Sequence, residues 1–283
     1  MQGYITLATG SRFYLDLAMN LVLSLKLNDS QRPVCVVTDP AMEIPADYRK
    51  FIDHVVFINS KPGFNGCLNK LRINELSPFE ETMFVDSDCI LLKKDMNRQW
   101  NKFQGPGFRS AGAKVTTGHW YGFDIADVIR KLGIDYMRTL NSGVFYFRND
   151  AESAKFFATA LELVENHKEL LGSFHRNKLQ LADEPFIGAA LGKLKIPTLD
   201  FDAAEGTIQV TTIKATNIHF DPFTQTSAIT RHDDYRLLGR FFPRKHVQHS
   251  PSFAHFVKLK PKAVYQRISD QLRDHFQLPR FVL

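Results

Sequence analysis

Short apolar runs alternate with segments of helical spacing along the first 170 residues. The helical segments cover residues 12–28, 68–76 and 151–169, and the first of them ends at a polar Asn-Asp-Ser triplet. The apolar runs, which we interpret as strands, cover residues 4–8, 33–39, 54–59, 82–86 and 143–147. Uninterrupted apolar strands are typical of a sheet that is buried on both faces. The pattern therefore predicts an α/β fold, with a Rossmann-like, mostly parallel sheet flanked by helices.

Two later segments depart from this alternation. Residues 104–123 contain five glycines together with His119, Trp120 and Tyr121, and long glycine-rich segments inside compact domains are often functional loops. We interpret this segment as a candidate lid over a binding site. From about Phe241 the chain becomes basic and aromatic and ends in a helical pattern. We therefore expect one domain over residues 1–240 and a C-terminal extension over residues 241–283.

Charge and cysteine content indicate which partners and which cellular compartment to expect. Residues 231–283 carry eleven Lys and Arg against four Asp and Glu, whereas residues 1–230 carry 25 against 26. A basic extension on a neutral body predicts contact with an anionic surface, and a solvated basic helix is the simpler alternative. No nucleic-acid-binding module accompanies it, so a nucleic-acid partner is not expected. Three cysteines without metal spacing, no signal core and no long apolar run favour a cytoplasmic protein, with attachment at the inner face of a membrane as a further option.

The main chemical signal is the pair Asp86 and Asp88, which ends the apolar strand at 82–86. Residues i and i+2 of a strand share a face, so both carboxylates can approach one ion. In open α/β sheets the ligand crevice lies at the carboxyl ends of the strands. Carboxylate oxygens suit Mn²⁺ or Mg²⁺, which also bind phosphates. The pair therefore predicts metal-assisted chemistry on a diphosphate ligand, although a D-x-D tripeptide also occurs as a simple turn.

Ordered segments around this pair resemble the glycogenin-like retaining glycosyltransferases, which have the GT-A fold and use nucleotide diphosphate sugars. They are "YITLATGSRFYLDLAMNLVLSLKLND" with "VCVVTD", "LNKLRINEL" before "MFVDSDCILL", "LNSGVFYFRND", "ADEPFIGAAL" and "NIHF". The resemblance covers residues 4–220. It implies a manganese ion at the D-x-D strand end and a UDP-sugar as the donor.

The resemblance also implies donor-binding positions. The strand end Leu7-Ala8-Thr9 would hold the nucleotide, largely through its backbone, and Asp39 would receive a polar group of the nucleotide. Lys70 would face the donor diphosphate or its sugar, where a cation stabilises the charge that builds on the leaving group. Strand-to-helix turns and a solvent-facing lysine are the structural alternatives.

Two polar corners are expected near the sugar. Asn141, Ser142 and Gly143 would contact its hydroxyls, with the glycine allowing close backbone approach. Asp183 would lie near the reacting face, followed by Glu184 where the family carries an amide. A retaining enzyme needs a carboxylate nucleophile or a front-face route, and the sequence leaves both open. The alternative for the corner at 141–143 is a simple turn, and the alternative for Asp183 and Glu184 is a pair of acids in the first turn of a helix.

By the same resemblance, His219 in "NIHF" would be the third metal ligand beside Asp86 and Asp88. The family continues with a glycine and a Lys-Pro-Trp element that binds the diphosphate, and this element does not follow His219. The cation that binds the donor diphosphate would then come from another part of the chain, and the candidates are Arg231, His232, Arg244 and Lys245.

These expectations combine into a metal-dependent hexosyltransferase that acts on a glycan or lipid-linked acceptor. A sugar-phosphate nucleotidyltransferase shares the fold class and the metal chemistry, but the glycine-rich basic loop and Pro-Lys element of that class do not appear in "LATGSRFY". A non-catalytic nucleotide-sugar-binding protein is the third alternative.

Overall fold

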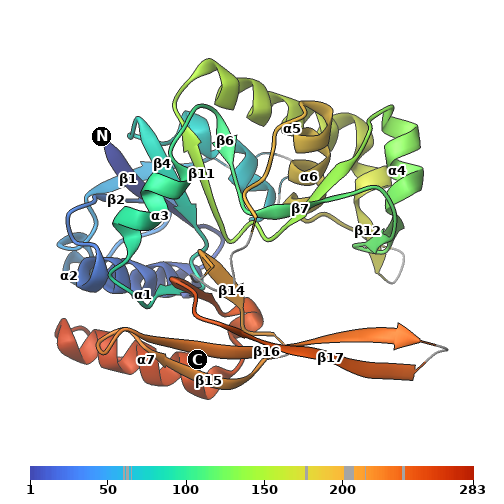
Figure 1. Ribbon diagram of the computed structural model, residues 1–283. Coiled ribbons are helices and arrows are strands. Elements are labelled where there is room, and N and C mark those ends of the chain that lie inside the picture. The colour runs from blue at the N-terminus through green and yellow to red at the C-terminus, as the bar shows by residue number, and fades with distance from the viewer. Residues whose placement is uncertain are drawn as a thin grey trace.

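The computed structural model describes residues 1–283 except 60, 62–63, 65, 176–177, 201–206, 214 and 238–239. Four strands are described in part by their backbone alone: β12 (Ser173–His175), β13 (Lys178–Gln180), β16 (Thr226–Leu237) and β17 (Arg240–His249). The helices and strands lie in layers around a central sheet (Figure 1). The α/β class predicted from the pattern is confirmed.

The central sheet has the order β3–β2–β1–β4–β11–β6. Its strands are β3 (His54–Phe57), β2 (Val34–Thr38), β1 (Gln2–Ala8), β4 (Glu81–Val85), β11 (Val144–Arg148) and β6 (Phe108–Arg109). β1, β2, β3 and β4 are parallel, whereas β11 runs antiparallel to both of its neighbours. Because β2 and β4 flank β1 on opposite sides, the strand order reverses between β1 and β4, and such a reversal opens a ligand crevice at the strand ends.

Side chains of the sheet alternate between two cores. Tyr4, Val36 and Met83 face one core, while Ile5 and Phe84 face the other. The first core is completed by α1 (Arg12–Asn28), α3 (Met96–Phe103) and α7 (Lys262–His275). The second is completed by the 3₁₀ helix η1 (Leu68–Glu75), α4 (Ile125–Leu132), α5 (Ala151–Leu171) and α6 (Asp183–Lys193). Burial on both faces explains the uninterrupted apolar strands.

A smaller sheet continues from the D-x-D segment. Its strands are β14 (Gln209–Thr211), β18 (Phe253–His255) and β5 (Cys89–Leu91), in that order. β18 is antiparallel to β5, and His255 lies directly opposite Cys89. This pairing brings the C-terminal part of the chain to the end of β4.

The segment expected to be a lid is largely structured. β7 (Gly112–Val115) pairs with β10 (Met137–Leu140), and β8 (His119–Trp120) pairs with β9 (Phe123–Asp124) in a tight hairpin. The remaining elements are α2 (Ala46–Arg49), β15 (Ala215–Asp221) and the 3₁₀ helix η2 (Val257–Leu259). β15, β16 and β17 form an antiparallel sheet along the lower edge of Figure 1.

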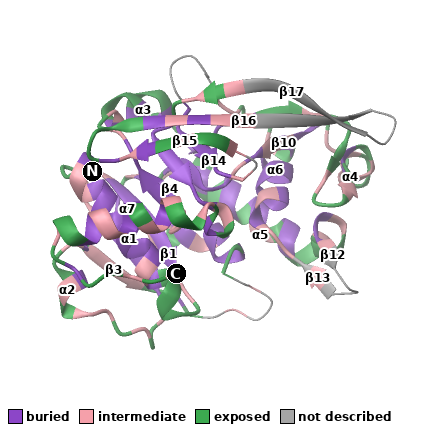
Figure 2. Cartoon of the chain, turned by 90° about the horizontal axis from the view of Figure 1, so that it is seen from below, coloured by how far each residue is buried: buried purple, intermediate pink, exposed green. Residues whose placement is uncertain are grey.

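The C-terminal helix is part of the main core. Tyr265, Ile268 and Leu272 are fully buried, and α7 lies beside α1 (Figures 1 and 2). Arg273 is 1% exposed, and its guanidinium donates hydrogen bonds to Asn20 Oδ1 and to the carbonyl oxygen of Asp16. The boundary that we expected between residues 240 and 241 falls at the start of β17, and the residues from 253 onward pack with the N-terminal half of the chain.

Among the described helices, none combines the length and the apolar character that a membrane span requires.

Candidate functional site

The D-x-D segment forms a tight turn where β4 ends. Asp86 N–H donates to the Gly143 carbonyl at 2.8 Å, and Cys89 N–H donates to the Asp86 carbonyl at 2.9 Å. These bonds fix the turn between the ends of β4 and β11 on one side and the start of β5 on the other. The Asp86 and Asp88 side chains are 20% and 24% exposed, so both remain accessible from the crevice.

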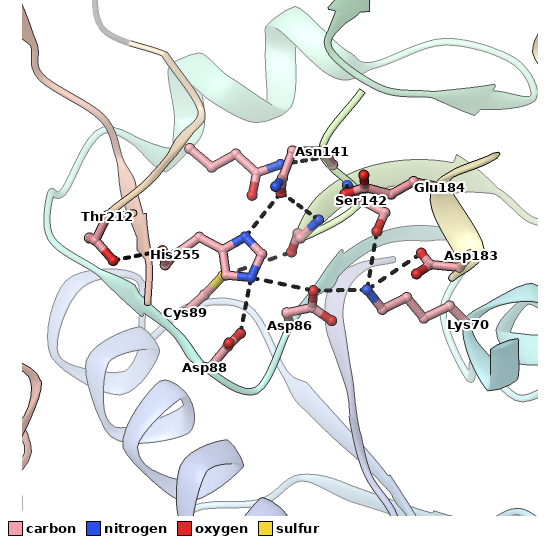
Figure 3. A network of polar contacts seen from close by, with 12 residues as sticks. Lys70, Asp86, Asp88, Cys89, Asn141, Ser142, Asp183, Glu184, Thr212 and His255 are labelled. Carbon is pink, nitrogen blue, oxygen red and sulfur yellow. Dashed lines mark hydrogen bonds and ion pairs between the residues drawn. The ribbon is translucent and has the colours of Figure 1, made fainter. Parts of the chain in front are cut away.

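His255 faces both carboxylates from β18 (Figure 3). Its Nε2 lies 3.2 Å from Asp88 Oδ1 and 3.7 Å from Asp86 Oδ2. Its Nδ1 lies 3.0 Å from Asn141 Oδ1. Because an amide oxygen only accepts, this contact places a proton on Nδ1 and directs Nε2 towards the aspartates. The ring is 7% exposed.

The histidine expected beside the D-x-D pair was His219, and the structure places a different one there. His219 lies on β15, where it is exposed and paired with Ala228 on β16. The physical reason is strand pairing, because β18, not β15, lies against the strand that follows the D-x-D turn. His255 therefore replaces His219 in our description of the site.

The dipeptide Lys260-Pro261 follows His255 after η2, and Lys260 is exposed. His255 and Lys260 are tied together through Thr212, whose N–H donates to the His255 carbonyl at 3.0 Å and whose hydroxyl donates to the Lys260 carbonyl. Of the four candidates for the cation that binds the diphosphate, Arg231 lies on β16 and is half-buried, whereas the side chains of His232, Arg244 and Lys245 lie outside the described residues.

Lys70 reaches the site from η1. Its Nζ lies 2.8 Å from Asp86 Oδ2, 3.2 Å from Ser142 Oγ and 3.5 Å from Asp183 Oδ2. The side chain is 8% exposed, so it is a buried cation between two carboxylates and not a solvent-facing helix residue. Among the described residues, no group donates a hydrogen bond to Asp183 Oδ2, although this atom is buried. A buried acceptor of this kind suits a ligand hydroxyl.

The charges of the site depend on one another. Burial lowers the pKa of Lys70, but the neighbouring carboxylates of Asp183 and Asp86 outweigh it and hold the pKa well above its usual value. Burial raises the pKa of Asp86. Burial also acts to raise the pKa of Asp88, but His255 stabilises the Asp88 anion more strongly, so the pKa of Asp88 is lowered overall. Burial lowers the pKa of His255, yet Asp88 raises it overall. The metal-free site therefore favours a protonated His255 beside an ionised Asp88.

The acids of α6 lie at its first turn, next to the polar corner 141–143. Ser142 N–H donates to Glu184 Oε1 at 3.1 Å, and the Tyr121 hydroxyl donates to Glu184 Oε2 at 2.9 Å. Burial raises the pKa of Glu184, and the charge of Asp183 adds to this effect. Both oxygens of this carboxylate are thus held in place by the protein.

Asn141 is expected to touch sugar hydroxyls, but its side chain is engaged within the protein. Its Oδ1 accepts from Gly143 N–H at 3.0 Å as well as facing His255 Nδ1. Gly143 leaves space for that ring, since a Cβ built on it would lie 2.5 Å from His255 Nδ1. The structure thus places Asn141 and Gly143 around His255.

The expected nucleotide platform lies at the ends of β1 and β2. Leu7 and Ala8 are buried in the sheet, so only their backbone is open to a ligand, while Thr9 is half-buried. Asp39 follows β2, and its Oδ2 accepts from Gly10 N–H at 2.5 Å. These residues lie at the crevice where the strand order reverses.

Two residues of the site were not identified from the sequence, His255 and Gln209, whereas Tyr121 belongs to the segment expected to be a lid. Gln209 on β14 is 3% exposed, and its Nε2 donates to the Asn141 carbonyl at 2.8 Å. "HFVKLKP" at 255–261 contains the histidine and the Lys-Pro dipeptide together, and that combination was the available signal for His255. No comparable pattern marks Gln209.

The donor set fits a hard or borderline divalent cation. Two carboxylates and one imidazole nitrogen converge at the end of β4, and Asn141 orients that imidazole from its far side. The Cys89 thiol also lies within 4.8 Å of the Asp88 and His255 ligand atoms, but burial holds its pKa well above the usual value. We therefore regard the carboxylates and the imidazole as the ligands.

Neither a scan against protein-family models nor a search of curated proteins finds a match. Solved structures do match. The galactosyltransferase LgtC, crystallised with donor and acceptor sugar analogues, aligns over 76% of this chain and 77% of its own, with a TM-score of 0.50 and 14% identity. An active-site mutant of LgtC, in which glutamate replaces a glutamine, aligns over 96% of both chains with a TM-score of 0.57 and 13% identity.

This chain has the GT-A glycosyltransferase fold. At these identities the likeness concerns the fold alone, so the chemistry depends on the residues of the site. In the GT-A fold of this chain, the carboxyl ends of β1 and β4 carry Thr9 and the Asp86–Asp88 turn, and β18 adds His255.

Proposed function

We propose that this protein is a metal-dependent glycosyltransferase that moves a hexose from a nucleotide diphosphate sugar, a UDP-sugar, to a hydroxyl of a glycan or lipid-linked glycan. The observation that carries the proposal is the convergence of Asp86, Asp88 and His255 at the strand-order reversal of a GT-A fold. This arrangement joins a divalent-metal donor set to a ligand crevice that suits a nucleotide.

Asp86, Asp88 and His255 would hold Mn²⁺ or Mg²⁺. The ion would offset the charge of the donor diphosphate and of the nucleoside diphosphate leaving group. Because the metal-free site favours a protonated His255, binding of the ion requires loss of the Nε2 proton. Asn141 keeps the other ring nitrogen protonated and so leaves Nε2 as the ligand atom.

The donor would extend from the ends of β1 and β2 towards α6. The backbone at Leu7, Ala8 and Thr9, together with Asp39, would receive the nucleoside. Lys260, which follows the metal-binding histidine, would supply a cation for the diphosphate, in place of the candidates that we took from β16 and β17. The Lys260 side chain is exposed to solvent, so its ammonium group is accessible to a bound phosphate.

The sugar would lie over Lys70, Ser142 and the first turn of α6. Asp183 Oδ2, a buried acceptor without a hydrogen-bond donor among the described residues, would receive a sugar hydroxyl. Lys70 would balance the charge of Asp183 and Asp86 there. Retention of configuration is what the family resemblance implies, and Glu184, which follows Asp183 in the first turn of α6, would be the second carboxylate near the reacting face.

Attachment to an anionic membrane remains a proposal, in a modified form. The apolar face of α7 is buried against α1, so it is not available for insertion into a bilayer. Exposed cations on or next to this helix, Lys258, Lys262 and Arg267, would provide an electrostatic contact instead. Sedimentation with anionic vesicles at low and high salt tests this contact, and equal sedimentation with neutral and anionic vesicles contradicts it.

The central experiment is a panel of nucleotide sugars with and without Mn²⁺, followed by release of nucleoside diphosphate and by thermal shift. We expect one donor to stabilise the protein and to be hydrolysed slowly in an Mn²⁺-dependent manner, and we expect Asp88→Asn to remove both effects. If no donor has an effect, the proposal fails. Pyrophosphate formation from a sugar phosphate and a nucleoside triphosphate would instead identify a nucleotidyltransferase, and donor stabilisation without turnover a binding protein.

A further inference from the structure

The β8–β9 hairpin contains an unfavourable residue at its tightest point. Its two turn residues are Tyr121 with φ of 50° and Gly122 with φ of 91°, and both values lie in the left-handed region. Two-residue hairpins with two positive φ values strongly favour Asn-Gly or Asp-Gly, since asparagine, aspartate and glycine tolerate this conformation. A tyrosine there is strained, and strained residues of this kind persist where the surrounding structure holds them, often at functional sites.

The contacts of the hairpin explain what holds the strained residue. The Tyr121 hydroxyl donates to Glu184 Oε2 at 2.9 Å, and the Trp120 ring packs edge-on against the Tyr121 ring at 5.6 Å. Trp120 in turn lies over Gly188 of α6, where a Cβ would approach its ring to 2.9 Å. The hairpin is therefore fitted to the first turns of α6 at two adjacent points.

The geometry points to Tyr121 as a positioning residue for the Glu184 carboxylate, which it holds together with Ser142 N–H so that one face of the carboxylate meets the sugar and the incoming acceptor hydroxyl. This inference rests on the proposed function, which it deepens by naming the acceptor-side wall. Tyr121 is 39% exposed, and Lys70 lies between Asp183 and Asp86, so the hairpin would border the end of the site away from the proposed metal ligands.

Position and charge are coupled in this arrangement. The charged and polar groups around Glu184 are Asp183 on the same helix, Lys70 from η1, Ser142 N–H from the corner before β11 and the Tyr121 hydroxyl from the hairpin. Burial and Asp183 raise the pKa of Glu184, while the hydrogen bonds from Ser142 N–H and Tyr121 lower it. Loss of the hydroxyl should therefore raise the pKa of Glu184 further, so that the carboxylate forms only at higher pH.

Two substitutions separate this role from a structural one. Tyr121→Phe keeps the ring and the strained backbone but loses the hydroxyl. Tyr121→Asn loses both the hydroxyl and the ring and places a residue that the turn prefers. Tyr136→Phe is the control, because Tyr136 packs near the opposite end of α6, where its carbonyl approaches Gly192. The purified full chain with Mn²⁺ and the UDP-sugar that it hydrolyses, with methyl and octyl glycosides as acceptor probes, supplies the assay.

We expect both Tyr121 variants to lose about tenfold in kcat, the size expected when one hydrogen bond to a charged group is removed. KM for the donor should be unchanged, and the acid limb of the pH–rate profile should move to higher pH. Tyr121→Asn should melt at a higher temperature than Tyr121→Phe while being equally slow, so activity and stability should not correlate. Tyr136→Phe should retain the wild-type profile.

The outcomes distinguish the two claims. Wild-type protein that hydrolyses a UDP-sugar, together with Tyr121 variants whose kcat and pH profile match it, overturns the role of Tyr121 alone. The same holds if activity falls only in proportion to melting temperature. Wild-type protein that turns over no UDP-sugar overturns the proposed function and this inference with it.

Discussion

Gly143→Ala tests how closely the metal site depends on one glycine. A Cβ at this position would lie 2.5 Å from His255 Nδ1 and 2.6 Å from Gln209 Oε1, whereas contacts of 3.4 Å and longer are ordinary. The His255 ring would have to move by about 0.5–0.9 Å to restore a separation of 3.0–3.4 Å. A shift of this size would be enough to lengthen or break the ring's contacts with Asn141, at 3.0 Å, and with Asp88, at 3.2 Å.

We expect Gly143→Ala to reduce metal binding and turnover more than it reduces the stability of the fold. Overpacking of a buried site typically lowers the free energy of unfolding by about 1–3 kcal/mol. A displacement approaching 1 Å in a catalytic site can lower the rate by about 100-fold. We therefore expect Gly143→Ala to remain folded, to bind Mn²⁺ more weakly and to turn over donor about 100-fold more slowly.

Calorimetric titration of Mn²⁺, donor hydrolysis and thermal melting give the three readouts. A double-mutant cycle on thermal stability adds specificity, because in a His255→Ala background the added methyl group meets no ring and should lower the melting temperature less than it does in the wild-type protein. Wild-type Mn²⁺ affinity and turnover in Gly143→Ala would refute the reasoning, since the ring would then be shown to move freely without consequence.

Two other predictions follow from the charges of the fold. The pKa of Asp88 is lowered in the folded protein, so this group adds stability above its unfolded pKa of about 3.9, and that stability is lost as pH falls through the folded pKa. The pKa of His255 is raised, so this group adds stability below its unfolded pKa of about 6.5, and that stability is lost as pH rises through the folded pKa. The melting temperature of metal-free protein should therefore decline above about pH 6.5 relative to that of His255→Asn, and Mn²⁺ affinity should rise over the same range; parallel pH curves for the two proteins would contradict this. Arg273→Met should lower the free energy of unfolding by about 3 kcal/mol, because it removes the hydrogen bonds of a buried guanidinium to Asn20 Oδ1 and to the Asp16 carbonyl. Denaturant titration measures that loss against the exposed control Arg280→Met, and equal midpoints would show that the C-terminal segment does not stabilise the core.

The sequence predicted the central sheet well because local pattern and tertiary burial agree there. Each strand of the predicted series corresponds to an observed strand, and the helix expected at residues 12–28 is α1. η1 shows the limit of periodicity, since the segment at 68–76 forms a 3₁₀ helix that turns Lys70 inward. Spacing alone did not distinguish this buried lysine from a solvent-facing one.

The candidate site was predicted in part. Asp86 and Asp88 were found because both follow one apolar strand, and local spacing is what a sequence shows directly. His255 was missed in favour of His219 because the choice depends on which distant strand pairs with β5. The C-terminal segment looked like an extension by charge, yet Lys262 and Arg267 of α7 are exposed while Tyr265, Leu272 and Arg273 join the core. Both differences concern contacts between residues far apart in the chain.

The most direct test compares the two histidines. Donor-dependent release of nucleoside diphosphate and Mn²⁺ affinity should be measured for His255→Asn and His219→Asn beside the wild-type protein. The account predicts that His255→Asn loses Mn²⁺ binding and turnover, whereas His219→Asn, changed at an exposed position of β15, keeps both. Full activity in His255→Asn, or its loss in His219→Asn alone, would contradict the assignment of the site.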